Sequence, residues 1–130
     1  MPTDSPFGCA RCFGGEAERV WTENPFEQVI ALVDDSHFTV RIVQCRACRQ
    51  HAVRTFTEFI DWSGGDDAQY WTVIPLTAEE AQQLIAQGDH VSAELIGQIS
   101  TGRWYLQADH PTGKPRRILW ARGPAWIMPA

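Results

Sequence analysis

Alternation of apolar and polar positions along the chain predicts a series of β-strands. The clearest alternation spans residues 38–44, and residues 51–62 continue it with aromatic and β-branched residues that favour a half-buried sheet. Residues 26–33 fit either a strand or a short helical turn. Further strands are predicted at residues 16–22, 69–74, 103–108 and 116–121. Pro75 is expected to end the second of these.

The helical signals lie in one stretch between residues 77 and 99. Thr77-Ala-Glu-Glu80 has the spacing of a capping box, in which the Thr77 hydroxyl accepts a backbone N–H while Glu80 reaches back to the cap. The helix that follows is predicted to end at Gly88, because glycine readily takes the conformation that ends a helix. Ser92 is a candidate cap for a second short helix over residues 93–99, which also fit a strand.

Together these elements predict an α+β fold, with an antiparallel β-sheet, one or two short helices and a C-terminal β-hairpin. The 130 residues, 44% of them hydrophobic, suffice for a single domain over residues 1–130, with a helix and the hairpin in about 69–130. No apolar run approaches the roughly 20 residues that cross a bilayer, so we expect no membrane partner. The N-terminal residues lack a basic region followed by an apolar core, and we therefore expect a cytoplasmic location.

The four cysteines of the chain form two pairs of identical spacing, Cys9 with Cys12 and Cys45 with Cys48. Thiols stay reduced in the cytoplasm, so such pairs bind a metal or act in redox chemistry more often than they form disulfides. Two pairs supply the four soft ligands of a closed tetrahedral zinc site, and we predict one structural Zn²⁺ per chain. A redox-active pair usually opens a helix, and neither pair precedes a predicted helix. His51, three residues after Cys48, could replace one of these ligands, although such a histidine more often lies on a strand surface.

At the two Cys-x-x-Cys pairs the chain resembles the zinc-ribbon group, over about residues 9–60. In that group each pair lies on a tight turn between strands, called a knuckle, and the metal joins the two knuckles. Zinc ribbons commonly have a glycine directly after the second cysteine of a pair, where this chain has Phe13 and Arg49. The group includes nucleic-acid-binding, protein-binding and purely structural members, so the resemblance implies no single activity.

The net charge of −5 is unevenly distributed. Residues 55–102 contain eight acidic residues and no Lys or Arg, whereas residues 41–54 contain four arginines and no acid, and residues 103–122 are also basic. The basic segments either neutralise the acidic middle and the zinc-bound thiolates or form a face for an anionic partner. The candidate anion or nucleic-acid contacts are Arg41, Arg46, Arg49, Arg54, Arg116 and Arg117.

No nucleophile, base and orienting group can be recognised together, so we predict no catalytic residue. Asp61, Asp66 and Asp67 lie in a loop rich in Ser and Gly, where they either bind a cation or form an ordinary turn. We expect a non-catalytic structural-zinc protein that acts as a protein-interaction or accessory module, with another protein as its partner. The alternative is a nucleic-acid-binding zinc ribbon that uses the basic second knuckle. An enzyme that uses the thiols or the loop carboxylates is a remote third.

Overall fold

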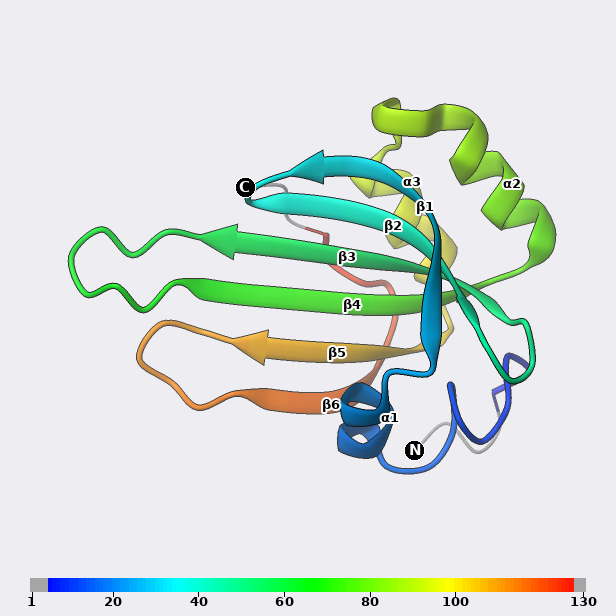
Figure 1. Ribbon diagram of the computed structural model, residues 1–130, viewed down its shortest axis with the longest axis horizontal. Helices are drawn as coiled ribbons and strands as arrows, with labels where there is room; N and C mark the ends of the chain where they lie inside the picture. The colour runs from blue at the N-terminus through cyan, green and yellow to red at the C-terminus, as the bar shows by residue number, and fades with distance from the viewer. Residues whose placement is uncertain (1–4, 128–130) are drawn as a thin grey trace.

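The computed structural model describes residues 5–127 and has an α+β fold built on one antiparallel sheet (Figure 1). The six strands follow one another across the sheet in chain order. Three helices and a short 3-10 turn complete the fold. The elements are α1 (Ala17–Glu23), β1 (Phe26–Asp35), β2 (Phe38–Cys45), β3 (His51–Phe59), β4 (Ala68–Leu76), α2 (Ala78–Gln87), η1 (Gly88–His90), α3 (Ala93–Ser100), β5 (Trp104–His110) and β6 (Arg117–Arg122).

The prediction of a strand at residues 16–22 is wrong, since this segment forms α1. Ala17, Val20 and Trp21 are spaced one helical turn apart, and Ala17 and Val20 are buried against the sheet. A seven-residue segment carries too few positions to separate a period of two from one of 3.6. The available sheet surface selects the helix, because it can bury this one face.

The two later helices are confirmed, and their caps are the residues that the sequence indicated. Thr77 and Glu80 form the capping box at the start of α2, which ends before Gly88. The Ser92 hydroxyl accepts a hydrogen bond from the backbone N–H of Leu95 at the start of α3. Residues 93–99 are therefore helical rather than extended, with Ile96 fully buried.

Pro75 lies inside β4 and does not end it, contrary to expectation. It is paired with Ala52 of β3, while the pairing of β4 with β5 ends at Val73. The carbonyl of Pro75 accepts a hydrogen bond from Arg103, on the side away from β3. The missing N–H of the proline therefore falls where no neighbouring strand needs a donor.

The two faces of the sheet have different covers, and successive residues of a strand point to opposite faces. Ile42 and Val53 face α2 and α3, where they pack with Ala81, Leu84 and Ile96. The next residue of β2, Val43, faces the other way, in the cluster that contains Cys12, Cys45 and the buried side of α1. Figure 1 shows α1 and the N-terminal segment at one end of this second face. Among residues 5–127, no helix covers the rest of that face.

The C-terminal segment closes the fold. β5 and β6 pair antiparallel as the last two strands of the sheet, so the expected hairpin extends the sheet instead of standing beside it. Beyond β6, Ile127 is buried, whereas Trp126 is 81% exposed. Within residues 5–127, none of the helices has the length and apolar character that a bilayer crossing requires.

Candidate metal centre

The four cysteines meet in one cluster, although 32 residues separate the two pairs. Cys9 and Cys12 lie on the turn before α1, Cys45 ends β2, and Cys48 lies in the turn between β2 and β3. The four Sγ atoms all lie within 4.8 Å of one another. Sequence alone indicated the pairs, and the fold brings them together.

The sulfur spacing fits a tetrahedral metal site. The Sγ atom of Cys12 lies 3.8 Å from that of Cys9 and 3.7 Å from that of Cys48. Four sulfurs bound to zinc at about 2.3 Å lie about 3.8 Å apart along the edges of the tetrahedron. A disulfide would instead bring two sulfurs to about 2.05 Å, and all four cysteines are free. The group could hold one metal ion.

Similar backbone turns hold the two pairs. In the first knuckle (residues 9–12), the carbonyl of Cys9 accepts hydrogen bonds from the N–H groups of Cys12 and Phe13. In the second knuckle (residues 45–48), the carbonyl of Cys45 accepts from Arg49 N–H, four residues on. Arg49 has a φ of 68°, in the left-handed region. It therefore adopts the conformation for which zinc ribbons commonly use glycine at this position.

A glycine is needed before the first cysteine instead. Gly8 has a φ of 74°, and a Cβ atom on it would lie 2.6 Å from the Sγ atom of Cys12. The N–H of Gly8 donates to the side chain of Gln50, whose amide group donates in turn to the carbonyl of Leu76. Gln50 thus ties the N-terminal segment to the second knuckle and to the end of β4. Neither residue was identified from the sequence.

Without a cation the cluster opposes ionisation of its innermost thiol. Cys12 and Cys45 are fully buried, and Cys48 is exposed. Burial, together with the neighbouring thiols, raises the pKa of Cys12 well above its ordinary value. Only thiolates bind metal, so a metal ion that binds Cys12 would have to displace its proton.

The six candidate arginines do not form one surface. Arg46 donates to the carbonyls of Asn24 and Phe26, and Arg49 forms an ion pair with Glu27, so both engage their own chain. Arg41 and Arg54 are direct partners across β2 and β3. These four lie near the cysteines or on the adjoining face.

Arg116 and Arg117 lie at the other end of the sheet. Arg117 is paired with Asp109 of β5, which lies level with Thr57 of β3 through the pairing of β4. Thr57 is six residues from His51, the residue that begins β3 after the second knuckle. At about 3.3 Å per residue, Arg117 therefore lies about 20 Å along the strands from the second knuckle and about 10 Å along them from Arg54.

The loop acids are occupied by their own loop. The carboxylate of Asp61 accepts hydrogen bonds from the N–H groups of Ser63, Gly64 and Asp66, which lower its pKa. Asp67 accepts from the N–H of Asp61, and Asp66 accepts from Gly113. Among the described residues, the four cysteines are the group of three or more potential ligands that could hold a metal, and His51 is not part of it.

Comparison of the chain with protein-family models, with curated proteins and with solved structures finds no match. The geometry of the sites therefore carries the functional argument. Two features dominate it: the four-thiol cluster and the uncovered part of the sheet beside it.

Proposed function

We propose that this chain is a non-catalytic, zinc-ribbon-like module, held together by one structural zinc ion, that acts by binding another protein. The four-cysteine cluster is the observation that carries the proposal. Its sulfur spacing matches a zinc tetrahedron, and four protein ligands leave no position for a substrate or a reactive water. Zinc would then contribute directly to the free energy of folding.

The cluster joins two parts of the chain that belong to different structural elements. The first knuckle belongs to an N-terminal segment outside the sheet, whereas the second is the connection between β2 and β3. Arg19 of α1 donates to the carbonyls of Ala10 and Gly14, so the helix follows the first knuckle. A bound metal would therefore help to hold α1 on the sheet, together with the packing of Ala17 and Val20.

Trp62 supports a protein partner. Its side chain is 89% exposed at the tip of the β3–β4 loop, where a large indole gains little from water. The hydrogen bonds of Asp61 and Asp67 hold that loop closed, so the indole is presented by a fixed backbone. Exposed tryptophans that become buried on association contribute strongly to protein interfaces.

Metal content tests the structural role. Protein purified without added metal should contain one zinc per chain, and a chelator should lower its melting temperature sharply. The Cys48→Ser variant should bind zinc more weakly; because Cys48 is exposed, the change removes no core packing. Asp89→Ser, an exposed substitution on η1, serves as the control. A folded protein that contains no metal and melts identically with and without chelator would contradict the proposal.

The partner is tested separately on the zinc-loaded protein. A protein isolated by crosslinking should bind the Trp62→Ala variant at least about tenfold more weakly than the wild type, as expected for an interface tryptophan. The Asp89→Ser variant should bind as the wild type does. If Trp62→Ala and the wild type bind the partner with equal affinity, this loop does not contribute to the interface.

The nucleic-acid alternative has weaker support. A basic track of several phosphate contacts would require Lys and Arg on one surface, and the arginines of the second knuckle lie at the opposite end of the sheet from Arg116 and Arg117. Arg46 and Arg49 also interact with their own chain. Binding of a single-stranded oligonucleotide that weakens steeply with salt would favour this alternative over the proposed module.

A further inference from the structure

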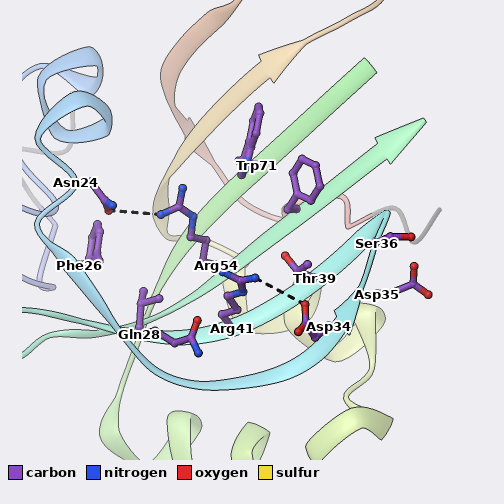
Figure 2. A pocket seen from close by; sticks show the side chains of 12 residues that line it. Asn24, Phe26, Gln28, Asp34, Asp35, Ser36, Thr39, Arg41, Arg54 and Trp71 are labelled. Carbon is purple, nitrogen blue, oxygen red and sulfur yellow. Dashed lines mark hydrogen bonds and ion pairs between the residues drawn. The ribbon is translucent and has the colours of Figure 1, made fainter. Parts of the chain in front are cut away.

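The uncovered part of the sheet face beside the cysteine cluster contains a hollow of about 570 Å³. β2, β3 and β4 form its floor, and the α1–β1 connection and the β1–β2 turn form opposite walls. Figure 2 shows Arg41 and Arg54 side by side within it, with Arg54 directed toward Asn24 and Arg41 toward Asp34. The volume lies in the range of small-molecule sites in proteins.

The two arginines are placed unfavourably for the unliganded protein. They are direct cross-strand partners, and like charges in that position destabilise a sheet. Burial, and then the charge of Arg41, lower the pKa of Arg54. Among the described residues, the buried Nε of Arg41 has no hydrogen-bond partner. Two guanidinium groups held together in this way favour an anion between them.

The chain compensates these charges only in part. Arg41 lies 3.8 Å from the carboxylate of Asp34, which is longer than a hydrogen bond, and that carboxylate is largely exposed. Arg54 makes a long hydrogen bond of 3.4 Å to the Asn24 side chain and stacks on Trp21 at 5.0 Å. None of these neighbours brings a buried negative charge to the pair.

Aromatic side chains stand next to the arginine pair. Phe56 and Trp71 line the hollow with their ring centroids 5.1 Å apart, and Trp21 lies against Trp71. Planar rings stack on such surfaces. At the opposite rim Asp34 and Asp35 would repel a long polyanion, although their oxygens can accept hydrogen bonds from hydroxyl groups.

We propose that this hollow is a binding site for a nucleoside monophosphate. The phosphate dianion lies between Arg41 and Arg54, whose two charges it balances, and the planar base stacks on Trp71 and Phe56. This site goes beyond the protein-binding module proposed above and requires no protein partner. The acidic rim distinguishes it from a track for single-stranded nucleic acid, which needs successive basic contacts.

Calorimetry on the zinc-loaded full chain tests the site, with AMP, adenosine, inorganic phosphate and a short oligothymidylate as probes. AMP should bind with a Kd below about 1 mM, and adenosine and phosphate at least about tenfold more weakly, since each lacks one half of the recognition. Arg41→Gln and Arg54→Gln should each weaken AMP binding at least about tenfold. Arg117→Gln, at the far end of the sheet, should bind AMP as the wild type does.

Melting curves add a readout that a merely structural arginine pair would not give. Without ligand, Arg41→Gln should melt no lower than the wild type, because it removes a repulsion. AMP should raise the melting temperatures of the wild type and of Arg117→Gln alike, and those of Arg41→Gln and Arg54→Gln less. Removal of zinc should weaken AMP binding, because Trp21 and Asn24 lie on the segment that the cysteine cluster positions.

Three results would overturn the site: no AMP binding at about 10 mM, AMP affinities of Arg41→Gln and Arg54→Gln equal to that of the wild type, or phosphate binding as tight as AMP binding. If the oligothymidylate binds but AMP does not, the hollow is a nucleic-acid-binding surface and not a nucleoside monophosphate site. Zinc is measured on the same samples, so a zinc-containing protein that fails to bind AMP refutes the hollow and leaves the structural-zinc module standing.

Discussion

Glu80 is expected to contribute strongly to stability through an ion pair with Arg103 that joins α2 to β5. The Glu80 carboxylate accepts hydrogen bonds from both terminal nitrogens of Arg103, at 2.6 and 2.7 Å, and a third from the N–H of Thr77 at 2.9 Å. The side chains are only 22% and 18% exposed. Arg103 also donates to the carbonyl of Pro75. One carboxylate thus fixes the start of α2, the end of β4 and the start of β5.

The Glu80→Gln substitution keeps the size of the side chain and removes its charge. Hydrogen bonds to charged groups contribute about 1.5–3 kcal/mol each to stability. Because an amide retains part of this bonding and water reaches both groups, we expect the unfolding free energy to fall by about 2 kcal/mol. At about 2.1 cal/mol/K per residue, unfolding of the 130 residues has an entropy near 0.27 kcal/mol/K. The melting temperature should therefore fall by about 7 °C.

The pH dependence follows from the pKa of Glu80. Burial opposes its ionisation, but the hydrogen bonds from Arg103 and Thr77 outweigh burial and hold the pKa below its ordinary value of 4.5. A lowered folded-state pKa means that this stabilisation is complete above pH 4.5 and is lost as the pH falls through the folded-state value. The difference in stability between wild type and Glu80→Gln should shrink in that window. Loss of metal in acid cancels in the difference, because both proteins carry the cysteine cluster.

Thermal unfolding of wild type, Glu80→Gln and Glu79→Gln measures the effect. Glu79 is an exposed residue of the same helical turn, so its variant loses only the weak interaction with the helix dipole. Arg103→Met should lower the unfolding free energy about as much as Glu80→Gln does. The double variant should show a coupling energy between the two residues of about 1–3 kcal/mol. A Glu80→Gln protein as stable as Glu79→Gln at pH 7, or a difference that persists unchanged well below pH 4, would refute the reasoning.

Two further predictions concern the backbone around the cysteine cluster. Arg49 has a φ of 68°, so Arg49→Gly should raise the unfolding free energy of the zinc-loaded protein by up to about 1 kcal/mol, as measured by urea unfolding. The β-branched Arg49→Val should lower it, and equal stability of the two variants would contradict this. Gly8→Ala should weaken zinc binding in competition with a chromophoric chelator, because the added Cβ would displace the Cys12 sulfur, while Gly65→Ala, with open space around the added Cβ, leaves it unchanged. An unaltered zinc affinity of Gly8→Ala would show that the first knuckle can shift to make room for the added Cβ without weakening metal binding.

Local sequence predicts the elements whose signals are local. The Thr77–Glu80 capping box determines the start of α2, because its hydrogen bonds are made within one turn. The alternation in β2 and β3 reflects two differently covered faces, which both strands share. α1 and Pro75 were predicted wrongly for one reason: each depends on which neighbouring strand or face is present. A short segment carries no information about that neighbour.

The arginine pair depends on register, which sequence supplies only in combination with the second knuckle. Gln44 is paired with His51 across that knuckle, and the same register places Arg41 opposite Arg54. Knowledge that residues 45–50 form a tight turn would have been enough to pair the two arginines. Asn24 and Trp71 could not have been found this way, because they enter the hollow from the α1–β1 connection and from β4.

The cysteine cluster and the hollow are joined by hydrogen bonds, so a metal bound by the cluster would have a role beyond stability. Arg46, inside the second knuckle, donates to the carbonyls of Asn24 and Phe26, and both of these residues line the hollow. Asn24 has a φ of 46° and contacts Arg54, so a small shift of the knuckle changes the wall that orients this arginine. Linkage is reciprocal: if the metal orders the wall for an anion, the anion must strengthen retention of the metal by the same factor. In that case the proposed metal site would form the rigid end of the proposed binding site, and Arg46 would join the two.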